Sequence, residues 1–111
     1  MRKTYEFDWT KIPPEDVIKT NDSKNPNTRI GSIPIRFGYN QYIADLYHQY
    51  FNKDNHGYTI CVYESNKKGE HKDWMFDVPI MTQVASERGY KILCNRCERN
   101  IIRRLRNIFW N

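Results

Sequence analysis

The sequence lacks the features that define several large classes of protein. No apolar run approaches the roughly 18 residues that a membrane-spanning helix needs, and no apolar segment of a secretory signal follows the basic N-terminus. Three cysteines are too few, and odd in number, for a disulfide framework. The five glycines are scattered and form no phosphate-binding loop. We therefore expect a soluble, cytoplasmic chain that works in a reducing compartment.

Alanine and glycine are scarce, whereas isoleucine, asparagine and lysine are abundant. The chain has 12 Ile, 11 Asn and 9 Lys but 2 Ala and 5 Gly. Because the codons of the first group are rich in A and T, the composition indicates an AT-rich genome, such as that of a low-GC bacterium, its phages or its plasmids. With 111 residues, 39% hydrophobic and 14% aromatic, the chain is long enough to fold as a single domain, 1–111.

Apolar periodicity predicts a mixture of strands and helices. The expected strands are 4–10, 33–37, 58–64 and 70–76, the last two joined by a tight turn into a hairpin. The expected helices are about 40–55, 78–89 and 97–110, with a short helix beginning near Pro13. Residues 20–31 are rich in turn formers, which predicts a surface loop. This order indicates an α+β fold, in which a small antiparallel sheet with a central hairpin is packed by two to three helices.

Positive charge is concentrated near the C-terminus. The chain has 18 Lys and Arg against 13 Asp and Glu, for a net charge of +5, and residues 88–106 alone carry seven basic residues and one acid, Glu98. A local excess of this kind indicates an anionic partner. On a helical projection the segment has an apolar stripe for the core and arginines along one edge. The expected contact residues are Arg96, Arg99, Arg103, Arg104, Arg106 and Trp110.

These arginines leave two binding mechanisms open. Guanidinium groups suit phosphate, carboxylate and base stacking, so the protein is expected to bind nucleic acid directly, as a small factor of a phage or mobile element. Alternatively, it binds a nucleic-acid-handling protein and inhibits a host defence nuclease, in the manner of anti-CRISPR or anti-restriction proteins. A merely solvated helix face is the simpler explanation, but such faces usually mix in acids, and here Glu98 alone is present.

The segment ahead of the basic helix is similar in one respect to a helix-turn-helix motif. Ala85 and Gly89 have the spacing of its first helix and turn. Residues 90–93 are expected to form a short apolar connection or strand. The whole segment from Tyr90 to Arg96 is too long for the turn of this motif, so no family is assigned.

Structural zinc and nuclease chemistry are weaker alternatives to binding. Cys94 and Cys97 have the spacing of one zinc ligand pair, which Cys61 together with His71 or His56 would complete if the hairpin folded over it. Otherwise the cysteines pack as small hydrophobic residues. Glu70 and Lys72 have the Glu-x-Lys spacing of some metal-dependent nucleases and toxins, without a preceding acid. We therefore expect a non-enzymatic binding protein without a cofactor.

Overall fold

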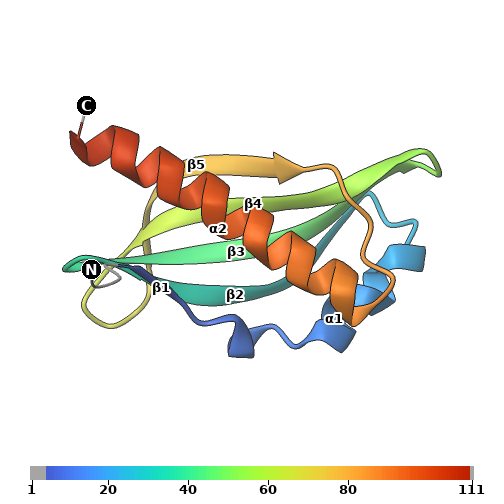
Figure 1. Cartoon of the computed structure of the whole chain (residues 1–111), viewed down its shortest axis with the longest axis horizontal. Helices are drawn as coiled ribbons and strands as arrows, with labels where there is room; N and C mark the ends of the chain where they lie inside the picture. Colours follow the sequence, from blue (N-terminus) through green and yellow to red (C-terminus); the bar gives the residue numbers. More distant parts are fainter. Residues whose placement is uncertain (1–4, 111) are drawn as a thin grey trace.

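The computed structural model describes residues 5–110, and of Trp110 the backbone alone. Its main element is a five-stranded antiparallel sheet whose strands are neighbours in chain order (Figure 1). The strands are β1 (Tyr5–Phe7), β2 (Asn27–Phe37), β3 (Asn40–Asn52), β4 (Asn55–Ser65) and β5 (His71–Ile80). The sheet is therefore a simple meander, interrupted between β1 and β2 by short helices.

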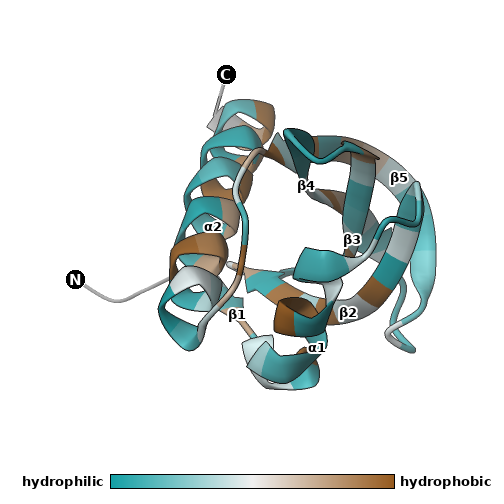
Figure 2. Cartoon of the chain, turned by 90° about the vertical axis from the view of Figure 1, so that its right-hand side faces the viewer, coloured by the Kyte–Doolittle hydropathy of each residue, from teal (hydrophilic) through white to brown (hydrophobic). Residues whose placement is uncertain are grey.

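One long helix covers one face of this sheet. The helix α2 (Glu87–Trp110) runs diagonally across the strands. The 3₁₀ turn η1 (Trp9–Lys11), the helix α1 (Pro14–Ile18) and the 3₁₀ turn η2 (Lys19–Asp22) follow one another from below the middle of the sheet toward the end where α2 begins (Figure 1). Seen along the long axis, α2 lies on one side of the curved sheet, and the opposite face carries no helix within residues 5–110 (Figure 2). The fold is broadly α+β. The prediction of a small sheet packed by two to three helices is wrong, because the described chain forms a large five-stranded sheet with one long and one short α-helix.

The core lies between α2 and the inner face of the sheet. Leu93, Cys97, Ile101 and Leu105 recur every four residues along α2 and are fully buried, as expected for one face of a helix. Alternate residues of the strands face them, among them Leu46 on β3. Burying each large apolar side chain contributes about 1.5–3 kcal/mol, so this interface fixes how α2 is rotated about its axis.

The helix predicted at 40–55 is wrong, since these residues form β3 and the turn to β4. Tyr42, Ala44 and Leu46 alternate toward the core, and β3 pairs with β2 on one side and with β4 on the other. Ile43 and Asp45 face the other way and are also buried. Burial on both faces obscured the period of two, so that the same residues also fitted a helical stripe.

The helix predicted at 78–89 and the link at 90–93 are also wrong. β5 continues to Ile80, a connection follows at 81–86, and α2 begins at Glu87 and includes the predicted helix 97–110. The Ser86 hydroxyl accepts a hydrogen bond from the Gly89 backbone N–H at 3.2 Å, which is N-terminal capping. Because 87–110 is a single helix, the turn of a helix-turn-helix is not formed there.

The predicted hairpin is present, whereas the predicted loop is shorter than expected. The strands at 58–64 and 70–76 lie within β4 and β5, which pair antiparallel. Of the loop predicted at 20–31, the first residues belong to η2 and those from Asn27 onward to β2, which pairs with the long strand β3. No helix in the described part of the chain has the length and apolarity to span a membrane.

Candidate functional site

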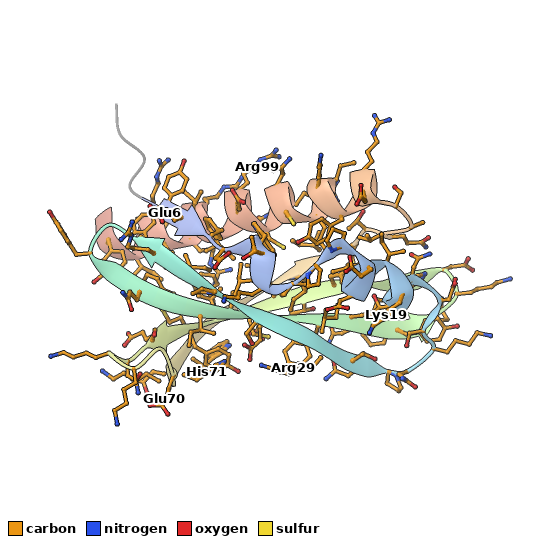
Figure 3. All side chains as sticks on the ribbon, turned by 90° about the horizontal axis from the view of Figure 1, so that it is seen from below. Glu6, Lys19, Arg29, Glu70, His71 and Arg99 are labelled. Atoms are coloured by element: carbon orange, nitrogen blue, oxygen red, sulfur yellow. The ribbon has the colours of Figure 1, made fainter. Side chains whose placement is uncertain are left out.

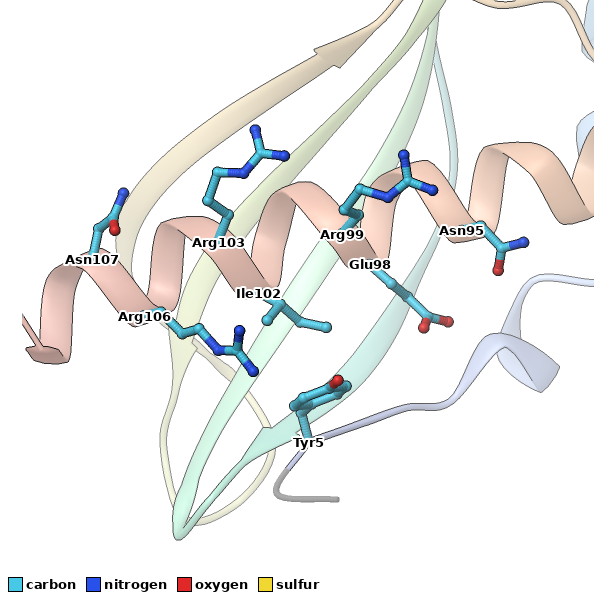
Figure 4. A pocket seen from close by; sticks show the side chains of 8 residues that line it. All are labelled: Tyr5, Asn95, Glu98, Arg99, Ile102, Arg103, Arg106 and Asn107. Atoms are coloured by element: carbon cyan, nitrogen blue, oxygen red, sulfur yellow. The ribbon is translucent and has the colours of Figure 1, made fainter. Parts of the chain in front are cut away.

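A groove of about 550 Å³ lies along α2, on its side toward β1 (Figure 4). Among the described residues, one from β1 and seven from α2 line it. They are Tyr5, Asn95, Glu98, Arg99, Ile102, Arg103, Arg106 and Asn107. Three cationic side chains therefore meet one acid, two amides, one aromatic ring and one aliphatic side chain in a single concave surface.

The rotation of α2 places the arginines in this groove. Arg99 and Arg103 each follow a buried core residue, Cys97 and Ile101, by two positions. Two positions correspond to about 200° around a helix, so both arginines project away from the sheet. Figure 4 shows Arg99 and Arg103 pointing to one side of α2, and Arg106 pointing to the other side, toward Tyr5.

Arg99 and Arg103 are not neutralised by neighbouring groups. Within residues 5–110, neither guanidinium group forms an ion pair or a side-chain hydrogen bond. Glu98 is adjacent in sequence, yet its Oε2 accepts a hydrogen bond from the Trp9 indole Nε1–H at 2.7 Å. The arginines therefore present their charge to solvent, as an anion-binding surface requires.

The remaining predicted contact residues lie elsewhere. The guanidinium carbon of Arg104 lies 4.6 Å from the centroid of the Phe76 ring, a cation–π contact on β5. Arg96 is exposed but does not line the groove. The Trp110 side chain lies outside the described residues. The structure thus brings together Arg99, Arg103 and Arg106 of the six predicted residues.

The three cysteines and His71, which were considered for zinc, are separated by the sheet. Cys94 and Cys97 are buried between α2 and the inner face, whereas Cys61 pairs with Asp45 on the opposite face, where His71 Nε2 lies 2.8 Å from Asp45 Oδ1. Burial raises the pKa of the Cys94 thiol to about 11 and that of Cys61 to about 12. All three thiols are free, and the buried pair on α2 packs in the hydrophobic core.

The residues considered for nuclease chemistry occupy the β4–β5 turn and its edge. The Glu70 Oε1 accepts a hydrogen bond from the Asn66 amide at 3.0 Å, and Lys72 Nζ lies 4.0 Å from Glu64 Oε2. No group of three or more His, Cys, Asp and Glu residues suited to a metal ion occurs in the described part of the chain.

A polar cluster on the open face of the sheet was missed by sequence reasoning. Asp45 is only 5% exposed, and its Oδ1 accepts hydrogen bonds from the Ser32 hydroxyl and from His71. Arg29 lies 3.7 Å from the same oxygen. Figure 3 places Arg29 and His71 on the side of the sheet opposite Arg99. The cluster is internally satisfied, and only the alternation of a strand at 40–52 would have indicated it.

Tyr5, Asn95, Glu98 and Ile102 of the groove were also missed. Asn95, Asn107 and Ile102 lie on the predicted basic helix or next to it, so their proximity to the arginines follows from helical spacing. Tyr5 comes from the other end of the chain, and no local signal places it there.

No family model matches the chain, and no curated protein or solved structure is significantly similar to it.

Proposed function

We propose that this protein binds nucleic acid through the groove between α2 and β1. The observation that carries the proposal is that Arg99, Arg103 and Arg106 line one groove, the first two without any anionic partner among the described residues. Guanidinium groups donate forked hydrogen bonds that fit phosphate oxygens. The cations would position the phosphate backbone in the groove.

The spacing of the arginines suits a chain of phosphates. With a rise of about 1.5 Å per residue, Arg99 and Arg103 lie about 6 Å apart along the helix axis, and Arg106 lies about 4.5 Å farther. Phosphates along one strand of a duplex advance by about 3.4 Å per nucleotide, and by more in an extended strand. The row therefore spans two or three nucleotides.

Fluorescence anisotropy of labelled single strands and duplexes across a salt series tests the proposal. Three phosphate contacts predict a slope of log K against log salt near −2 on single strands, at about −0.7 per contact, and near −3 on duplex DNA. Absence of binding even at low salt would refute the proposal. In that case a protein target, as in the inhibitor alternative, would become the leading candidate.

Two neighbouring arginines provide matched variants. Arg103→Glu reverses a charge in the groove, whereas Arg104→Glu reverses the same charge beside Phe76, away from the groove. Because a hydrogen bond to a charged group contributes about 1.5–3 kcal/mol, we expect Arg103→Glu to weaken binding by about 10- to 150-fold. Arg104→Glu should have a much smaller effect. An equal loss in both would mean that net charge and not the groove drives binding, and circular dichroism checks that both variants are folded.

A further inference from the structure

Glu98 is an acid in the lining of a groove that is otherwise suited to anions. Of the residues that line the groove, it is the only acidic one, and no lysine, arginine or histidine in the described range pairs with it. A carboxylate repels a nearby phosphate. The part of a ligand that contacts Glu98 must therefore be a hydrogen-bond donor, although the part that contacts the arginines is anionic.

The Glu98 carboxylate is also held in place. The Trp9 indole N–H donates to its Oε2 at 2.7 Å from the other end of the chain, and the Trp9 ring stacks on Phe7 at a centroid distance of 6.4 Å. A carboxylate accepts up to about four hydrogen bonds, so the single bond from Trp9 leaves lone pairs on both oxygens. Figure 4 shows Glu98 and Arg106 pointing to the same side of α2 as Tyr5, with Ile102 between them.

We infer that this groove binds single-stranded nucleic acid and reads an unpaired guanine with Glu98. Guanine presents two adjacent donors on its Watson–Crick edge, N1–H and the N2 amino group, which match the two oxygens of a carboxylate. Adenine, cytosine and uracil present one donor group each on that edge. The partly exposed Tyr5 ring and the Ile102 side chain supply an aromatic and apolar surface for the base, while the arginines hold its phosphates.

The same geometry disfavours duplex DNA as the preferred ligand. In a duplex the Watson–Crick edge of guanine is occupied by cytosine, so its adjacent N1–H and N2 donors cannot both reach the Glu98 carboxylate. Unpaired bases, in contrast, are commonly read on this edge by hydrogen bonds combined with stacking on aromatic rings. The inference rests on the proposed function and adds to it the strandedness and the base.

The test compares oligouridine eight nucleotides long, about one binding-site length, with the same strand carrying one central G, A or C. It uses anisotropy with the full-length protein, on RNA and on the corresponding deoxy strands. One bidentate base contact gives about 5- to 150-fold discrimination. We expect tighter binding of the G strand by a factor in this range, and weaker binding of a blunt duplex that contains the same G.

Glu98→Gln should abolish the preference for G, because the glutamine side chain has one acceptor and one donor, whereas guanine presents two donors that each need an acceptor. Binding of the all-uridine strand should be unchanged or tighter, since a negative charge is lost from the groove. Glu87→Gln makes the same charge change on the first turn of α2, outside the groove, and should keep the preference. Trp9→Phe retains an aromatic ring beside Phe7 but frees Glu98, and should lower the ratio of G to U affinity without strengthening uridine binding.

The outcomes separate this inference from the proposed function. Equal binding of all four strands by the wild-type protein, or a G preference that survives in Glu98→Gln, would overturn the guanine assignment and leave nucleic-acid binding in place. Tighter binding of duplex than of single strands would likewise overturn it. Failure to bind any strand at low salt would overturn both.

Discussion

Truncating Leu105 to alanine tests the rotation of α2, on which the position of the groove depends. Leu105 is fully buried and is the last of the core residues that recur every four positions along the helix. A leucine-to-alanine change at such a site removes buried apolar atoms and leaves a cavity, at a cost of about 2–5 kcal/mol. A domain of this size has a total stability of roughly 5–15 kcal/mol, so the variant should fold but unfold much more easily.

The matched control is Ile108→Ala, three residues further along the same helix. Ile108 is 51% exposed, and surface truncations usually change stability by no more than about 0.5 kcal/mol, so we expect a small effect. Urea unfolding followed by circular dichroism gives both free energies. A difference of about 2 kcal/mol or more between the variants would agree with the structure, and thermal midpoints should differ by roughly 8 °C or more, at about 4 °C per kcal/mol.

A loss from Ile108→Ala that equals or exceeds the loss from Leu105→Ala would refute the reasoning. It would mean that a different face of α2 packs on the sheet. Arg99 and Arg103 would then no longer lie opposite the buried residues, and the groove would not form as described. The stability measurement is therefore also a test of the functional geometry, and it needs no ligand.

Two other features make distinct predictions. A Cβ atom at Gly57 would lie 2.8 Å from the Ile80 carbonyl oxygen, so Gly57→Ala should cost about 1–3 kcal/mol through overpacking; an unchanged urea midpoint would contradict this close approach. Burial, and then the charge of His56, lower the pKa of His48 below its ordinary 6.5. The folded protein therefore favours the neutral form of His48. The stabilising contribution of neutral His48 is complete above the pKa that His48 has in the unfolded chain, and it is lost as the pH falls below that value toward the lower pKa of the folded state. The urea midpoint should be lower at pH 5 than at pH 7.5, and His48→Gln should reduce that difference; a difference that persists in full would assign the acid sensitivity to other groups.

Local patterns were sufficient to predict the elements that have a single clear period. The β4–β5 hairpin has a turn sequence between two strand-like runs. Ile101 and Leu105 of the apolar stripe predicted on the C-terminal helix are fully buried, whereas Ile108 and Phe109 of the same stripe are 51% and 45% exposed. In the hairpin, and in the helix up to Leu105, the pattern visible in the sequence also decides the packing. These elements needed no information about distant parts of the chain.

β3 could not be predicted in this way because both of its faces are buried. Tyr42 and Leu46 face α2, while Ile43 and Asp45 are buried on the other face, Asp45 beneath its own hydrogen-bonded cluster. A strand paired on both sides and buried on both faces does not alternate in polarity. Its identity is fixed by pairing with β2 and β4, which is a property of the whole sheet.

The cysteine pair shows how the surrounding element changes the meaning of a motif. Cys94 and Cys97 lie three residues apart on a continuous helix, so both reach its buried side. A zinc ligand pair of this spacing normally lies in a turn, and the sequence did not indicate that α2 begins ten residues before position 97. Once the helix is known, hydrophobic packing explains both thiols, and burial raises both of their pKa values.

The candidate site was predicted in its charge but not in its shape. Seven basic residues within 88–106 were all available to an anion as far as the sequence could show, yet packing divides them: Arg104 lies on Phe76, and Arg99, Arg103 and Arg106 line the groove. The two descriptions predict different salt dependence. If all seven cations contacted phosphates of a single strand, the slope would be near −5, whereas three contacts give about −2. A measured slope near the smaller value would therefore assign binding to the groove, because net charge by itself cannot select three of seven neighbouring cations.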